Sequence, residues 1–305
     1  MTTVEGASPA ERWHTEGWCV LEDVFTPSEV AEARDAVVEL FPTADVVASG
    51  EVGEDRIGWG APKPVFPFAS GALNRLVVHD SLIDLAEELL GTDRLRLYQG
   101  MVSAKYPGLR DEYEQLLHVD YGNHTLVVPR DDVGYQHLEL FVYLADVAPE
   151  TAATRIVSRR LTTGIPVERT YLALDEYAAL YDAEEPASGP AGAVLAYRPD
   201  VYHRGTAMTS GTETRFLLHV AYRPAEAEWV GFHTWPVAGE GLDWHRFVGQ
   251  ATVRQLTVLG FPEPGHPYWT PETVAGVGAR YPALDMAPWA VGGPGGAPGA
   301  PSGGS

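Results

Sequence analysis

The chain has 305 residues, 45% of them hydrophobic and 21% charged, which is the balance of a globular protein with a sizeable core. Its 42 acidic residues outnumber 21 lysines and arginines, giving a formal net charge of −21, so neither nucleic acid nor an anionic membrane is an expected partner. No apolar run reaches the ~18 residues of a membrane helix, no secretory signal is visible, and the single Cys19 excludes an internal disulfide, so a cytoplasmic protein is expected.

The front of the chain has a helical pattern. The run Thr26-Pro27-Ser28-Glu29 is a helix-start signal, with a threonine N-cap, proline at the first helical position and glutamate at the third. Apolar residues then recur at helical spacing from Val30 to Phe41. A second helix is expected over about 81–90, with Gly91 as its stop.

From about Leu95 the pattern changes to short runs rich in β-branched and aromatic residues, separated by Pro, Gly and Asp. These runs are LRLYQGMVSAK, HLELFVYLAD, ATRIVS, AGAVLAYR and TRFLLHVAY. They predict a β-sandwich or barrel with helices packed outside it, and helices return near 248–258 and 271–280. We predict one domain over 1–290, followed by a disordered Gly/Pro-rich tail over 291–305.

Three His-x-acid triplets are candidate metal sites, because residues i and i+2 of a strand point to the same face. His14-Thr15-Glu16 lies in a polar helical stretch and is interpreted as surface. His137-Leu138-Glu139 lies in an expected strand, where a solvent-facing row is favoured over a ligand role. His118-Val119-Asp120 follows a strand and a polar loop and has a distal partner in His203, which favours this triplet.

Two imidazoles and one carboxylate leave coordination positions open, as a non-haem Fe(II) oxygenase requires for a 2-oxo acid and dioxygen. Arg215 opens the strand run that follows His203. A buried arginine near a metal needs an anion, because an unpaired buried charge is costly. A dicarboxylate chelated to the metal at one end would supply that anion at the other, as a bidentate pair.

Five blocks between about residues 12 and 223 resemble, in the same order, those of the phytanoyl-CoA dioxygenase family of Fe(II)/2-oxoglutarate oxygenases. The blocks are GWCVLEDVFTPSEVAEAR, QGMVSAKYPG, LLHVDYGNH, VYLADVAPETAATRIV and AGAVLAYRPDVYHRGTAMTSGTETRF. The resemblance implies a mainly β fold with flanking helices. Its core, over about 95–223, would be a double-stranded β-helix, which is a cupin-like jelly roll.

The resemblance also implies roles for particular residues. By position, iron would be bound by His118, Asp120 and His203. Arg215 would hold the distal carboxylate of 2-oxoglutarate, with the Thr206 hydroxyl as a second contact. The co-substrate pocket would be lined by alternating residues of one strand, namely Gln99, Met101 and Ser103.

The sequence departs from the family pattern near the expected cavity mouth. Thr151-Ala152 stands where the family has Asn-Gly, and Ser158-Arg159-Arg160-Leu161 where it has Pro-Gly-Ser-His. Arg159 and Arg160 belong to a basic cluster that would clamp an acidic substrate group or, as the favoured interpretation, pair with surface carboxylates. His124 is a further candidate for the pocket wall.

The leading hypothesis is an Fe(II)/2-oxoglutarate-dependent dioxygenase that hydroxylates a small organic molecule and releases succinate and CO2. Halogenating members of the family replace the metal-binding carboxylate, so Asp120 favours hydroxylation or a related C–H oxidation. The alternatives are a jelly-roll metalloprotein with redox-neutral chemistry, such as an isomerase or hydrolase, and a non-catalytic binding relative. An acidic or otherwise polar substrate is expected.

Overall fold

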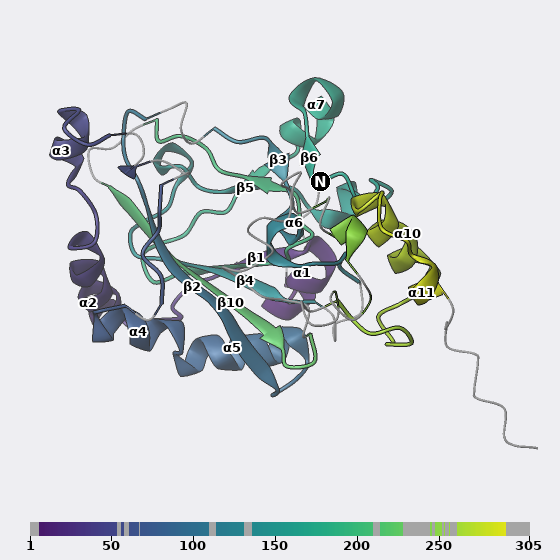
Figure 1. Cartoon of the computed structure of the whole chain (residues 1–305). Coiled ribbons are helices and arrows are strands. Elements are labelled where there is room, and N and C mark those ends of the chain that lie inside the picture. The colour runs from purple at the N-terminus through teal and green to yellow at the C-terminus, as the bar shows by residue number, and fades with distance from the viewer. Residues whose placement is uncertain are drawn as a thin grey trace, which may run out of the picture. The chain divides into compact units, whose positions relative to one another are not determined.

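The computed structural model in Figure 1 describes residues 6–53, 56–57, 61–66, 68–109, 114–130, 136–209, 214–227, 245, 248–251, 253, 256 and 261–290. The chain divides into two compact units, one of Met1–Tyr121 with Asp132–Ala227 and the other of Gly122–Asp131 with Glu228–Ser305. The expected tail over 291–305 and five of the eleven positions of the helix expected near 248–258 lie outside the described residues. The single domain over 1–290 stays a prediction.

The first five helices of the first unit begin at capping residues. Helix α2 (Pro27–Val38) starts at the predicted Thr26, whose hydroxyl accepts from the Glu29 amide while the Glu29 carboxylate accepts from the Thr26 amide. Helix α5 (Asp80–Leu90) ends at Gly91, which confirms the second predicted helix. Among the described residues before 227, the other helices are α1 (Pro9–Glu16), α3 (Ala44–Ala48), α4 (Gly71–Val77), α6 (Tyr121–His124) and α7 (Leu174–Asp182), with the 3-10 turns η3 (Pro149–Thr151) and η4 (Arg159–Leu161).

Two antiparallel five-stranded sheets form the β core of this unit. The first has the order β1-β8-β4-β10-β2, built from β1 (Trp18–Leu21), β8 (Val194–Tyr197), β4 (Leu138–Tyr143), β10 (Arg215–Pro224) and β2 (Leu95–Lys105). The second has the order β6-β3-β9-β5-β7, built from β6 (Tyr171–Leu172), β3 (Leu117–His118), β9 (His203–Arg204), β5 (Arg155–Ile156) and β7 (Glu185–Pro186). The predicted mainly β jelly-roll class with flanking helices is confirmed.

One face of the first sheet packs against the helices. Alternation along the strands places Val102, Leu140 and Leu218 on this face, in one buried cluster with Leu82 and Leu89 of α5. Figure 1 shows α4 and α5 lying along the strands β2 and β10. Burial of these apolar side chains fixes which face of each strand turns outward, since a one-residue slip would reverse every side chain.

The opposite face of the first sheet packs toward the second sheet. Phe141, Tyr143 and Leu217 lie in a separate buried cluster with Ile156 of β5 and Val201, which precedes β9. Polar residues of these strands that share this inner face are therefore held between the two sheets. This is the face from which the candidate site is built.

The second unit contains α10 (Pro271–Arg280), as predicted over 271–280, and α11 (Ala287–Ala290). Its two chain segments are joined by hydrogen bonds, from the Tyr268 hydroxyl to the Val128 carbonyl at 2.6 Å and from the Arg280 guanidinium to the Val127 carbonyl at 3.0 Å. Among the described residues, no helix combines the length and apolarity needed to cross a bilayer.

Two glycines adopt left-handed backbone conformations, but an added side chain would meet a neighbouring atom at only one of them. Gly17 has φ +86° and a Cβ there would lie 2.3 Å from Val201 Cγ2, whereas Gly91 has φ +65° with nothing within 4 Å. We expect Gly91→Ala to lower the free energy of unfolding by about 1–2 kcal/mol, the cost of a left-handed L residue. Gly17→Ala should cost more in urea unfolding, because Val201 must also move. Equal losses of unfolding free energy in the two variants would show that the Val201 side chain moves aside without an energetic cost.

Candidate metal centre

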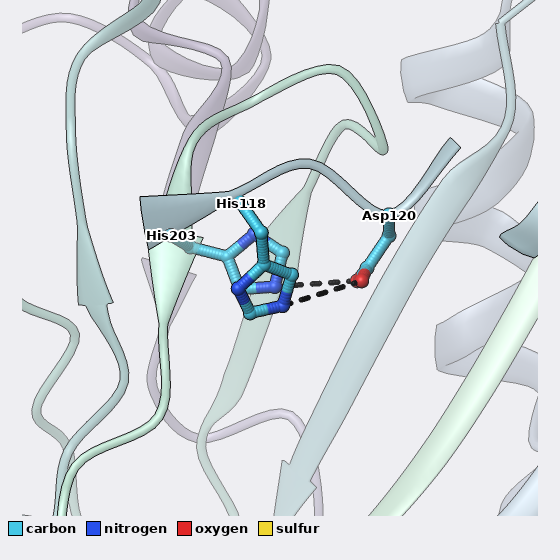
Figure 2. Close-up of side chains that lie close together, drawn as sticks. All are labelled: His118, Asp120 and His203. Atoms are coloured by element: carbon cyan, nitrogen blue, oxygen red, sulfur yellow. Dashed lines mark ion pairs between the residues drawn. The ribbon is translucent and has the colours of Figure 1, made fainter. Parts of the chain in front are cut away.

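Three side chains of the first unit converge on one point, as Figure 2 shows. The imidazoles of His118 and His203 and the carboxylate of Asp120 each offer a ligand atom, and these atoms lie within 4.8 Å of one another. Asp120 Oδ2 is 3.2 Å from His203 Nε2, and Oδ1 is 3.7 Å from His118 Nε2. The structure thus brings together the predicted triad, while its role as an iron site stays a prediction.

Backbone pairing places the three ligands. Strands β3 and β9 are antiparallel neighbours in which His118 and His203 are direct Cα partners, so their side chains share one face. Asp120 lies just past the end of β3, where its amide donates to the Pro199 carbonyl at 2.9 Å. The Val119 amide donates to the Thr170 carbonyl at 3.0 Å, which anchors the backbone between the two ligands.

Both histidines are held in the same tautomer. His118 Nδ1 lies 2.8 Å from the Leu116 carbonyl and His203 Nδ1 lies 3.0 Å from the Val201 carbonyl. A carbonyl only accepts, so each Nδ1 carries the proton and each Nε2 is the ligand atom turned toward Asp120. Two imidazole nitrogens and one carboxylate oxygen form a donor set that suits a divalent transition metal with open positions.

The two imidazoles respond differently to their surroundings. Burial, and then the neighbouring His203, lower the pKa of His118. Burial also acts to lower the pKa of His203, but the charge and hydrogen bond of the nearer Asp120 outweigh it, so the net shift is upward. A metal binds the neutral imidazole, so protonation of His203 opposes metal binding.

Tyr197 of β8 adds a hydrogen bond to the triad. Its hydroxyl donates to Asp120 Oδ2 at 2.8 Å, and its ring centroid lies 4.8 Å from that of His203. Burial, followed by the negative charge of Asp120, raises the pKa of Tyr197 well above its ordinary value. The phenol therefore stays protonated and acts as a donor.

The inner face of β2 and β10 carries the predicted co-substrate residues. Cross-strand Cα partners are Ala221 with Gln99, His219 with Met101, Leu217 with Ser103 and Arg215 with Lys105. These pairs lie on one face of the sheet, as the alternation of Gln99, Met101 and Ser103 predicted. Ser103 Oγ is engaged with His219 Nε2 at 2.7 Å. The roles of these residues toward a co-substrate stay predictions.

Lys105 is a buried cation beside Arg215 that the sequence reasoning did not nominate. Arg215 donates to the Ala152 carbonyl at 2.6 Å, and the Lys105 ammonium donates to the Thr206 carbonyl at 2.8 Å. The Thr206 hydroxyl donates to the Ala153 carbonyl at 3.3 Å. Burial first, and then the charge of Arg215, lower the pKa of Lys105. Residues two apart on a strand share a face, so the alternation that selected Ser103 also predicts Lys105 on the same face.

The two arginines suggested for substrate binding contact the N-terminal helix. Arg159 donates to the His14 carbonyl at 3.4 Å, and Arg160 pairs with Glu16 at 3.2 Å, so both guanidinium groups contact α1. These contacts agree with the surface-pairing interpretation of the basic cluster. His124 belongs to the second unit.

The interpretation of His137-Leu138-Glu139 as a solvent-facing row is wrong. The side chains of His137 and Glu139 are each 2% exposed. The Tyr98 hydroxyl lies 2.5 Å from His137 Nδ1 and also donates to Glu139 Oε1. The physical reason is that β4 is a central strand, paired with β8 and β10 and covered on both faces, so alternation along it does not expose one face.

The hydroxyl of Tyr98 should stabilise the fold because it hydrogen-bonds a buried carboxylate. We expect Tyr98→Phe to lower the free energy of unfolding by about 1–3 kcal/mol, the cost of depriving a buried charged group of a donor. Tyr222→Phe is the matched control, since that hydroxyl donates to the neutral Val77 carbonyl at 2.5 Å. Urea unfolding of both variants gives the comparison, and an equal or smaller loss for Tyr98→Phe would contradict it.

Solved structures of other proteins share this fold. EctD from S. alaskensis, crystallised with bound Fe, aligns with a TM-score of 0.56 at 21% identity, covering 79% of this chain and 87% of that one. The α-ketoglutarate-dependent carbocyclase SnoK from nogalamycin biosynthesis gives 0.54 at 21% identity, covering 77% and 90%. The epimerase SnoN, in complex with Fe3+, α-ketoglutarate and nogalamycin RO, gives 0.51 at 20% identity, covering 71% and 82%.

No curated protein sequence was found to match the chain. A family model, that of phytanoyl-CoA dioxygenase (PhyH), matches residues 13–216. This stretch contains both sheets apart from residues 217–224 of β10, and it includes all three residues of the triad. The chain belongs to the phytanoyl-CoA dioxygenase family.

Proposed function

We propose that the protein is an Fe(II)- and 2-oxoglutarate-dependent oxygenase that hydroxylates, or otherwise oxidises a C–H bond of, a small organic molecule. The observation that carries the proposal is the convergence of His118, Asp120 and His203 on one point, with both Nε2 atoms turned inward. Membership of the family and the Fe- and α-ketoglutarate-dependent enzymes among its structural neighbours support the same class.

The triad would hold the metal. Its two imidazole nitrogens and one carboxylate oxygen fit Fe(II), and such a set leaves positions for a bidentate 2-oxo acid and for dioxygen. Bound iron would supply the activation of dioxygen, coupled to oxidative decarboxylation of 2-oxoglutarate to succinate and CO2. The chain's own residues then bind, orient and shield the reactants.

The co-substrate would be held at its distal end by two cations. Arg215 is 4% exposed and its cross-strand partner Lys105 is 7% exposed, so both charges lie in a site largely withdrawn from water. A carboxylate accepts two parallel hydrogen bonds from a guanidinium, and an adjacent ammonium adds charge. Gln99, Met101 and Ser103 lie on the same face of the sheet and would flank the remainder of the molecule.

The class of oxidation rests on Asp120. With a carboxylate at this position, hydroxylation is the first outcome to test. SnoN and SnoK are described as an epimerase and a carbocyclase, so product analysis should also search for isomerised and ring-closed products. The contacts of Arg159 and Arg160 with α1 lend no support to an acidic substrate, so the screen should include neutral and basic molecules.

Metal and co-substrate binding can be tested before any substrate is known. Anaerobic titration with Fe(II) and then 2-oxoglutarate should develop the visible charge-transfer band of a chelated 2-oxo acid. Asp120→Ala should weaken the band because it weakens metal binding, and Arg215→Ala should retain the metal but need a higher 2-oxoglutarate concentration. Tight binding of another divalent metal with no band would instead favour the redox-neutral alternative.

A second titration tests the role of Lys105. We expect Lys105→Met to weaken 2-oxoglutarate binding by about tenfold to a hundredfold, corresponding to the loss of one charged hydrogen bond. Lys63→Met is the matched control, because the Lys63 ammonium donates to the Ala61 carbonyl at 2.7 Å on a different segment. Iron affinity should be unchanged in both variants. If Lys105→Met and Lys63→Met bind 2-oxoglutarate with equal affinity, Lys105 does not belong to the co-substrate site.

A further inference from the structure

The contact between Tyr197 and Asp120 joins a strand of the first sheet to a ligand held beside the second. Tyr197 ends β8, whereas Asp120 follows β3. The hydroxyl donates to Asp120 Oδ2 at 2.8 Å, and the Tyr197 side chain is buried, with 1% of the residue exposed. A phenylalanine in place of Tyr197 would fill the same space without making this bond.

We propose that Tyr197 is a positioning residue, whose hydroxyl fixes the orientation of the Asp120 carboxylate and thereby sets the metal affinity of the triad. The inference rests on the proposed function and deepens it. It gives a specific task to a residue that is not itself a metal ligand.

The backbone contacts of Asp120 do not by themselves fix the orientation of its carboxylate. The amides of Asp120 and Tyr121 both donate to the Pro199 carbonyl, at 2.9 and 3.0 Å, so the chain is anchored at the ligand. The carboxylate can still rotate about the two side-chain torsions of aspartate. A ligating carboxylate uses one oxygen for the metal, and the other remains an acceptor. A hydrogen bond to Oδ2 restricts this rotation and so fixes how the carboxylate faces the two imidazoles.

The ring of Tyr197 is itself rigidly held. Its Cα is paired with Trp18 on one side and with Glu139 on the other, and its ring lies 5.1 Å from that of Phe141. The same ring packs 4.8 Å from His203. One side chain therefore contacts two members of the triad, and it fixes the carboxylate relative to the imidazole.

Tyr197 has a second buried carboxylate as a neighbour across the strands. That carboxylate, Glu139, already accepts a hydrogen bond from Tyr98. The two buried acids are thus bonded by different tyrosines, Glu139 by Tyr98 and Asp120 by Tyr197.

The test measures metal binding alone. Fe(II) affinity would be determined anaerobically by competition with a coloured chelator, and the visible spectrum of the Co(II) form would report coordination geometry. We expect Tyr197→Phe to bind Fe(II) about 10–100-fold more weakly, the range found when partners of metal ligands are removed, and to alter the Co(II) spectrum. Tyr143→Phe is the control, because that hydroxyl donates to the Ala187 carbonyl at 2.6 Å, and it should bind as the parent does.

A double-mutant cycle separates positioning from loss of structure. In an Asp120→Ala background there is no carboxylate to orient, so Tyr197→Phe should cause no further loss of metal affinity. An equal loss in both backgrounds would assign the effect to the fold and overturn the inference. Parent-like affinity and spectrum in Tyr197→Phe would overturn it while leaving the proposed function standing. If the parent protein does not bind Fe(II), both the inference and the proposed function are contradicted.

Discussion

The antiparallel pairing of β3 with β9 is the contact on which the candidate centre depends. It joins residues that are far apart in the sequence and makes His118 and His203 direct partners on one face. Each strand has only two residues, so the ladder alone would be weak. The Leu116 and Val201 carbonyls and the Pro199 carbonyl reinforce it, because they bind the ligand imidazoles and the Asp120 amide.

Much of this arrangement could be predicted from the sequence, because its signals are local. Thr26 with Glu29 marks a helix start wherever the helix packs, and the period of two in LRLYQGMVSAK places Gln99 and Ser103 on one face. The His-x-Asp spacing and a distal histidine identified the three residues of the triad in the sequence. The arginine at the start of the next strand run identified Arg215. Family resemblance added the order of the blocks and the jelly-roll topology.

What could not be predicted depends on long-range contacts. The sequence pattern of β4 shows which residues share a face but not which strands lie on either side of it. The row with His137 and Glu139 was therefore predicted to face solvent, whereas β4 is a central strand and both side chains are buried. Arg160 pairs with a residue of α1, far back in the chain, and no local signal indicates that partner. The run AGAVLAYR predicts a strand, yet only the packed fold shows that its tyrosine hydroxyl meets Asp120.

The pairing of Lys105 with Arg215 has a consequence for the energetics of the whole chain. Two like charges at adjacent buried positions repel each other, and the depressed pKa of Lys105 reflects first the loss of water and then that repulsion. An anion bound by both groups relieves this cost only in the native state. By linkage, such a ligand adds its binding free energy to that of folding, so the resistance of the protein to unfolding would follow the cellular supply of its co-substrate.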